Sequence, residues 1–173
     1  MIVQLNHSNK KDYNKSNDGF MVTGRLLPRY ENGNWTYREE TYSEPYFKEY
    51  ELEEVDTSYI GGTDKAVYLY YVGGCCVGQI RLRGNWNGFA MIEDICVARD
   101  WRQKGVGSAL LDKAEEWARQ KGYLGLMLET QDVNVSACRF YAKNGFVIGA
   151  VDTMLYSNFS TADEIAIYWY RRF

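Results

Sequence analysis

The chain has 173 residues, of which 46% are hydrophobic and 25% charged, and its formal net charge is −3. This length is enough to bury one core and short for two, so we predict that residues 1–173 form a single domain. The slight acidic excess argues against nucleic acid as a partner, because phosphate binding requires clustered lysine and arginine. A cationic small molecule fits this charge better.

Histidine and cysteine usage excludes several kinds of site. The single histidine, His7, lies in a polar stretch, which removes Ser-His-Asp and Cys-His catalysis. Cys75, Cys76, Cys96 and Cys138 contain no Cys-x-x-Cys pair, so we expect no metal site and no disulfide framework. Free thiols favour a reducing compartment. With neither a signal-peptide pattern nor an apolar run near the ~20 residues of a membrane span, a cytoplasmic protein without membrane contact is expected.

The first third of the chain carries three signals. Residues 1–18 are polar and are expected to be flexible. Apolar segments between residues 20 and 37 flank Asn32-Gly33, a dipeptide typical of two-residue hairpin turns. Residues 39–56 hold a run of acidic side chains against the single cation Lys48. Such a run is typical of a solvated helix or loop surface, and the alternative is an electrostatic funnel for a polycationic substrate.

The rest of the chain alternates between strand and helix patterns. A helix is expected from Val106 to a stop at Lys121-Gly122, and a second helix follows Asn134, a natural N-cap. Strands are expected at 66–72, 75–82, 89–97, 124–129, 146–154 and 165–170, with the second helix at 135–143. This order predicts an α+β fold, or a mixed α/β fold if the strand-helix-strand unit is parallel.

The most informative segment is the one that joins the 89–97 strand to the first helix. It holds two glycines, Gly105 and Gly107, and opens directly onto the helix. Backbone N–H groups at a helix start carry partial positive charge, and Arg102 and Lys104 add to it, so an anion site is expected. The segment lacks the Gly-Lys-Ser/Thr ending of a Walker loop and the glycine spacing of a dinucleotide fingerprint.

Two blocks of sequence carry a family resemblance. They are Arg102-Gln103-Lys104-Gly105-Val106 with its preceding strand, and the stretch from Asn134 through Tyr141 to Gly145-Phe146. Over residues 66–170 the chain resembles the GNAT superfamily of acetyl-CoA-dependent N-acetyltransferases, and within it the chain is similar to the streptothricin acetyltransferases. The resemblance implies a central twisted, mostly antiparallel sheet with flanking helices. It also implies that acetyl-CoA is the acetyl donor.

The resemblance assigns acetyl-CoA binding to the strand, the glycine loop and the second helix. The residues are Ile95, Cys96, Val97, Arg102, Gln103, Lys104, Gly105, Val106, Gly107, Ser108, Asn134 and Tyr141. The strand residues would bind pantetheine through the backbone, with Cys96 packed between its neighbours. Asn134 would bind pantetheine or cap its helix, and the two roles are compatible.

The chemistry requires a base and an acid. An amine with a pKa near ~10 arrives protonated at neutral pH, so a general base must take a proton before it attacks the thioester. Glu93 is the first candidate; Asp94 points to the opposite face of an ideal strand, and a β-bulge could exchange the two directions. By the resemblance, Tyr141 protonates the departing CoA thiolate.

The acceptor implied by the resemblance is the β-lysine amine of streptothricin. Acidic and aromatic side chains suit such a polycation, so Trp86, Asp94, Asp152 and Glu164 are candidates for substrate binding. Two alternatives stay open: acetylation of a polyamine or protein lysine, and a non-catalytic acyl-CoA sensor. Homodimers are common among relatives, although no residue here establishes one.

Overall fold

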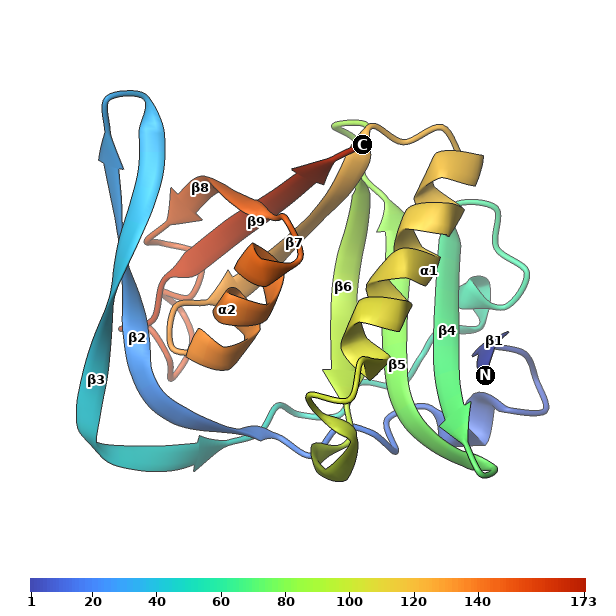
Figure 1. The fold of residues 1–173 in the computed structure, drawn as a ribbon. Helices are drawn as coiled ribbons and strands as arrows, with labels where there is room; N and C mark the ends of the chain where they lie inside the picture. The colour runs from blue at the N-terminus through green and yellow to red at the C-terminus, as the bar shows by residue number, and fades with distance from the viewer. The chain divides into compact units, whose positions relative to one another are not determined.

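The computed structural model describes residues 1–173 (Figure 1). It confirms the α+β class, because mostly antiparallel strands are combined with two α-helices. Two compact units are present: 1–18, 50–126 and 172–173 form the first, and 19–49 and 127–171 form the second. Each unit is described by itself below, and the expectation of one domain stays a prediction.

The first unit is built on four strands that follow the order β1-β4-β5-β6. Their bounds are β1 (Ile2–Gln4), β4 (Lys65–Val72), β5 (Cys75–Gly84) and β6 (Ala90–Val97). All three pairings are antiparallel. The predicted hairpin across Gly73-Gly74 is therefore confirmed, and so is the third strand that follows it.

Helix α1 (Val106–Gln120) covers one face of β4, β5 and β6 (Figure 1). Its buried side chains recur every three or four residues, as in Val106, Leu110 and Ala114. The helix approaches β5 closely at Gly78, where an added Cβ would lie 2.9 Å from Val106 Cγ1. Neither α1 nor any other helix is long and apolar enough to cross a membrane.

Residues 1–18 differ from the flexible segment that we expected from the sequence. β1 pairs with β4, and a short 3-10 helix (Lys10–Asp12) follows it. Leu5 is buried in a core cluster with Val67 and Leu69. The segment is ordered because its side chains find partners far along the chain. Two further 3-10 helices of this unit lie at Thr57–Tyr59 and Arg99–Trp101.

The second unit begins with a long hairpin of β2 (Phe20–Glu31) and β3 (Asn34–Lys48). Asn32 and Gly33 have φ values of 51° and 80°, so the predicted Asn-Gly turn is confirmed. The acidic run was expected in a helix or loop, and this was wrong for its first half, which lies in β3. The acidic side chains of the run are exposed, as expected for a solvated surface.

The remainder of the second unit has the strand order β7-β9-β8. The elements are β7 (Gly125–Gln131), α2 (Val135–Lys143), β8 (Val147–Asp152) and β9 (Ala166–Arg172). Helix α2 contacts β2. The side chain of Asn134 accepts a hydrogen bond from the backbone N–H of Ala137, which confirms the predicted N-cap. Leu26, Leu128, Ile167 and Trp169 are among its fully buried side chains.

Candidate functional site

The glycine loop of the first unit has the backbone shape expected of a ligand-binding turn. Gln103 has φ 60° and Gly105 has φ 83°, both in the left-handed region. Gly105 is the N-cap of α1, and the first hydrogen bond of the helix runs from Ala109 N to Gly105 O at 3.0 Å. An L side chain is strained at such a φ, so glycine suits position 105 for conformational reasons.

This loop also has room for an anion. The N–H groups of the first helical turn have no acceptor within the helix, and the helix dipole makes this end positive. No heavy atom from residues distant in the chain lies within 4 Å of the point where a Cβ on Gly105 would stand. Arg102 Nε donates to Val97 O at 2.9 Å, which ties the loop to the end of β6. The arrangement fits a diphosphate such as that of CoA.

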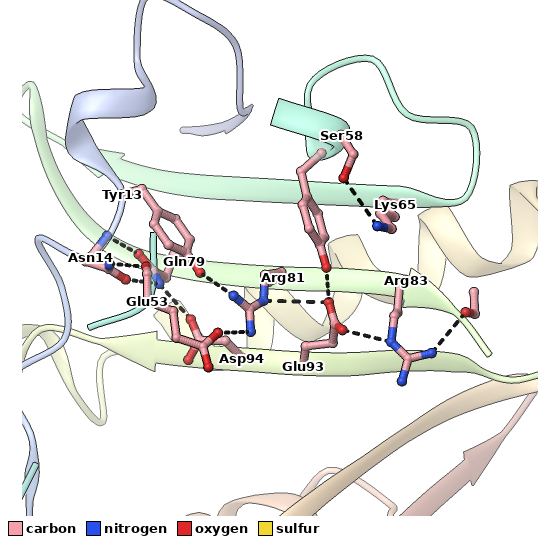
Figure 2. A network of polar contacts seen from close by, with 12 residues as sticks. Tyr13, Asn14, Glu53, Ser58, Lys65, Gln79, Arg81, Arg83, Glu93 and Asp94 are labelled. Carbon is pink, nitrogen blue, oxygen red and sulfur yellow. Dashed lines mark hydrogen bonds and ion pairs between the residues drawn. The ribbon is translucent and has the colours of Figure 1, made fainter. Parts of the chain in front are cut away.

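Strand β6 contains a bulge at the two candidate base residues. In its pairing with β5, Arg81 faces Asp94 and Leu82 faces Ile92, so Glu93 is the extra residue. Glu93 and Asp94 therefore point to the same face of the strands, toward the side chains of β5 (Figure 2). In an ideal strand the Glu93 and Asp94 side chains would point to opposite faces. The bulge, which the sequence left open, places them on the same face.

Glu93 accepts two hydrogen bonds and has one further cation nearby. Tyr59 donates its hydroxyl proton to Oε2, and Arg83 Nε donates to Oε1 at 2.7 Å. Arg81 Nε lies 3.6 Å from Oε2 and forms a second ion pair. Both oxygens of this carboxylate thus have cationic or hydroxyl partners (Figure 2).

Asp94 has different surroundings. Its hydrogen bond comes from a neutral amide, Gln79 Nε2, at 2.6 Å, and it forms no ion pair. Burial raises the pKa of the Asp94 carboxyl, although the Gln79 hydrogen bond and the charge of Arg81 act in the opposite direction. Gln79 is itself fixed by Asn14, whose backbone N donates to Gln79 Oε1 at 2.7 Å. Asp94 is thus a partly buried carboxylate with one neutral hydrogen-bond donor and no ion pair, whereas Glu93 has cationic partners.

The end of β6 carries the residues assigned to pantetheine. Ile95 and Val97 pair with Ile80 and Gly78 of β5. Cys96 Sγ lies 3.3 Å from the hydroxyl of the buried Ser16. Burial raises the pKa of the Cys96 thiol well above its usual range, so the thiol stays neutral and serves packing.

The second unit contains the two candidates from the second block. Tyr141 of α2 is only 7% exposed, and its ring centroid lies 5.8 Å from that of Phe146 and 6.3 Å from that of Trp169. Asn134 uses its side-chain oxygen to cap α2, at 3.2 Å from Ala137 N. The family resemblance implies that Tyr141 is the acid and that Asn134 binds pantetheine or caps its helix; the acid and pantetheine roles stay predictions.

The candidate substrate residues lie in three settings besides that of Asp94. Trp86 is 94% exposed in the turn between β5 and β6, where its ring is accessible to a ligand. Asp152 accepts hydrogen bonds from the backbone N–H groups of Met154 and Leu155, at 2.8 and 3.0 Å, and so shapes a turn. Glu164 is 5% exposed and pairs with Lys48, while its Oε2 has no hydrogen-bond partner.

Several polar residues at these places escaped the sequence analysis. In the first unit they are Gln79, Arg81 and Arg83, which alternate with apolar residues along β5 and so share one face. That alternation was a usable signal, although it also fits a strand with one solvated face. In the second unit, buried Glu129 accepts a hydrogen bond from Tyr156, and burial raises the pKa of its carboxyl.

Comparisons with known proteins agree with these features. The model of the acetyltransferase (GNAT) family matches residues 28–146. Streptothricin acetyltransferase A of Bacillus subtilis (strain 168) is 60% identical over 173 residues, which are 100% of both chains. Streptothricin acetyltransferase of Escherichia coli is 39% identical over 127 residues, 73% of this chain and 70% of that protein. The crystal structure of a Bacillus anthracis protein in complex with acetyl coenzyme A has a TM-score of 0.91 and 37% identity, covering 100% of this chain and 97% of that one.

Proposed function

Since this chain belongs to the acetyltransferase (GNAT) family, we propose that it transfers acetyl from acetyl-CoA to a primary amine of streptothricin and thereby inactivates the antibiotic. The observation that carries this proposal is the 60% identity to Streptothricin acetyltransferase A of Bacillus subtilis along the whole chain. A cytoplasmic location, the absence of a nucleic-acid partner and a homodimeric assembly stay predictions.

The glycine loop is the proposed binding site of the CoA diphosphate. N–H groups of Val106 and Gly107 at the start of α1 would donate to its oxygens, with positive charge added by Arg102 and Lys104. Lys104 Nζ lies 5.1 Å from the ring centroid of Trp101, which keeps this flexible cation beside the loop. Ile95 and Val97 would bind the pantetheine arm through their backbone groups, as in the strand addition of a peptide.

The reaction moves protons as well as acetyl. The substrate ammonium first gives one proton to a base, and the freed nitrogen lone pair attacks the thioester carbonyl carbon. When the C–S bond breaks, sulfur leaves as a thiolate and takes up a proton, for which we propose Tyr141 as donor. The new amide nitrogen loses its second proton, which restores the Tyr141 hydroxyl, and the base returns its proton to water. The balance is therefore one amide, one CoA thiol and one proton released.

The acceptor is cationic, and exposed acidic and aromatic groups would favour its approach. Acidic side chains at positions 39–56 are solvated, so they attract a polycation over a distance that falls with ionic strength. The exposed ring of Trp86 offers a face for an ammonium group. Glu164 and Asp152 stay proposed contacts, although each already has a partner within the second unit.

Mass spectrometry of a streptothricin reaction tests the proposal. With acetyl-CoA and purified protein, we expect one added acetyl group on streptothricin, located by fragmentation to the β-lysine moiety. Parallel reactions with spermidine and with a lysine peptide separate the alternative acceptors. CoA-dependent thermal stabilisation without CoA release with any of these amines would contradict the proposal and identify a sensor.

A further inference from the structure

The bulge of β6 brings two consecutive carboxylates to one face of the first unit and gives them unequal surroundings. Figure 2 shows both side chains directed toward β5, with Glu93 beside Arg81 and Arg83 and with Asp94 beside Gln79. A base for the ammonium proton must have a lone pair free for it. The two neighbourhoods therefore predict different chemistry.

Glu93 is the anchor of the pair. One of its oxygens accepts a hydrogen bond from the Tyr59 hydroxyl and the other accepts one from the Arg83 guanidinium. The guanidinium of Arg81 forms a longer ion pair with it. Arg83 is in turn fixed by Asn85 Oδ1 at 3.0 Å. These partners use an acceptor site on each of the two Glu93 oxygens. Glu93 is suited to holding the bulge in shape.

Asp94 has the surroundings of a proton acceptor. Its sole hydrogen bond comes from the Gln79 amide, so the carboxyl keeps acceptor capacity, and no cation pairs with it. The charged and titratable groups around it are Arg81 of β5, Glu93 and Cys96 of β6, and Glu53 and Tyr13 of the covering segments. The two carboxylates among these neighbours oppose its negative charge, and Arg81 is shared with both of them.

We infer that Asp94, and not Glu93, takes the proton of the substrate ammonium, with Gln79 and Asn14 as its positioning residues. The inference rests on the proposed acetyl transfer. The carboxylate of Asp94 accepts one proton from the ammonium and becomes a carboxylic acid, which returns that proton to water after the acetylated product leaves. Gln79 holds the carboxylate through Nε2, and Asn14 holds both ends of the Gln79 amide.

The pH dependence of kcat/KM tests the assignment with an amine that the wild-type protein accepts. Activity falls on the acid side when the base is protonated. Asp94→Asn is expected to lower kcat by about 10²–10⁴-fold and to abolish the acid limb, with little change in the KM for acetyl-CoA. Glu93→Gln is expected to keep the acid limb. The reverse pattern, or an unchanged kcat and limb in Asp94→Asn, would overturn the inference.

Variants of the positioning residues test the inference through the position of the acid limb, which a merely structural change would leave unaltered. Gln79→Met removes the donor that favours the charged carboxylate, so the acid limb should move to higher pH. Asn14→Gly keeps the left-handed backbone, φ 71°, and removes the side-chain contacts to Gln79 Nε2 and Glu53 O, so a smaller shift in the same direction is expected. Asn32→Gly, at the β2–β3 turn with φ 51°, is the matched control and should leave the limb in place.

An infrared titration follows the protonation of the Asp94 carboxyl without any acceptor substrate. Glu129→Gln serves as the background for all variants, because Glu129 is a second carboxyl whose pKa burial raises. In this background the carbonyl band of protonated Asp94 should titrate above the ordinary range of aspartate, also when Glu93→Gln is added, and should be missing when Asp94→Asn is added. Absence of this band from the Glu129→Gln background, or its persistence when Asp94→Asn is added, would overturn the inference even if streptothricin is acetylated. A band that behaves as expected, with no acetylation of streptothricin, would overturn only the proposed acceptor.

Discussion

In the first unit the partly buried polar side chains join one network on a single face of β5 and β6, whereas in the second unit they form separate small groups. Arg81 alone contacts Glu53, Glu93 and Tyr13 in the first unit. In the second unit Arg25 pairs with Asp132, and Lys48 pairs with Glu164. The two units therefore differ in redundancy. A residue in the network keeps other partners when one is removed, whereas a residue in a separate ion pair keeps few.

This difference also separates chemistry from scaffolding. The network surrounds two carboxylates at a strand bulge and gives each of them different hydrogen-bond donors. The pairs of the second unit tie the β2–β3 hairpin to the turns before β9, since Asp132 also accepts from Ile165 N at 3.1 Å. We therefore expect variants of the network to change activity profiles and variants of the pairs to change stability.

The largest expected effect concerns Tyr141, a polar group of the second unit that packs between aromatic rings and is proposed to act in chemistry. Tyr141→Phe removes the hydroxyl and keeps the ring contacts with Phe146 and Trp169. If the hydroxyl protonates the thiolate, kcat should fall about 10²–10⁴-fold while the affinity for acetyl-CoA changes little. Steady-state kinetics and calorimetry measure the two quantities, and an undiminished kcat would remove Tyr141 from the mechanism.

The next largest effect should follow from breaking one of the separate ion pairs of the second unit. The side chain of Asp132 is 0% exposed, and it accepts Arg25 Nε at 2.7 Å. Asp132→Ala removes the carboxylate that pairs with Arg25 and should lower the free energy of unfolding by about 3–5 kcal/mol, measured by urea denaturation. Glu31→Ala, which breaks the exposed pair with Arg29, is the control and should cost less than about 1 kcal/mol. Equal losses for the two variants would contradict the comparison.

Backbone strain gives an effect of intermediate size that separates stability from binding. Gly105→Ala forces an L residue to φ 83° and should cost about 1–2 kcal/mol of stability. Gly33→Ala, at φ 80° and also with open space around its Cβ position, is a matched control with the same expected cost. Only Gly105→Ala should weaken acetyl-CoA binding, as measured by calorimetry. Equal affinity in both variants would argue against the loop as the diphosphate site.

A smaller effect, of opposite sign, is expected when the buried acid is neutralised. The pKa of Asp94 is raised in the folded protein, so its contribution to stability is present at low pH and is lost as pH rises through the folded pKa. Asp94→Asn cannot lose a proton. At pH 8 it should therefore unfold with a free energy about 1 kcal/mol higher than the wild type, with the difference shrinking toward pH 4. The opposite trend, in which Asp94→Asn loses stability relative to the wild type as the pH rises from 4 to 8, would contradict this expectation.

The smallest effect tests the redundancy of the network directly. Glu53 pairs with Arg81 at 2.9 Å, but its side chain is 72% exposed. Glu53→Gln should change the free energy of unfolding by less than about 1 kcal/mol, because Arg81 keeps Glu93 and Tyr13 as partners. A loss as large as that of Asp132→Ala in urea denaturation would show that the first unit has no redundancy.

Much of the local structure could be predicted from the sequence because its signals are contiguous. The turns at Asn32-Gly33 and Gly73-Gly74, the N-cap Asn134 and the glycine loop before α1 each depend on neighbours a few residues away. The elements they bound begin and end within a few residues of their predicted positions. The family resemblance lies in the same segments.

Contacts between distant segments were decided only by the tertiary structure. Residues 1–18 read as flexible because the partners of Asp12 and Asn14, Tyr71 and Gln79, lie 59 and 65 positions away. The placement of Glu93 and Asp94 on one face depends on a bulge in the pairing with β5, which no local pattern specifies. Sequence by itself determined the elements and the loop, because propensity, turn geometry and capping are local energies. The tertiary structure decided which carboxylate has ion-pair partners and which has none, because charge and desolvation act between residues that only folding brings together.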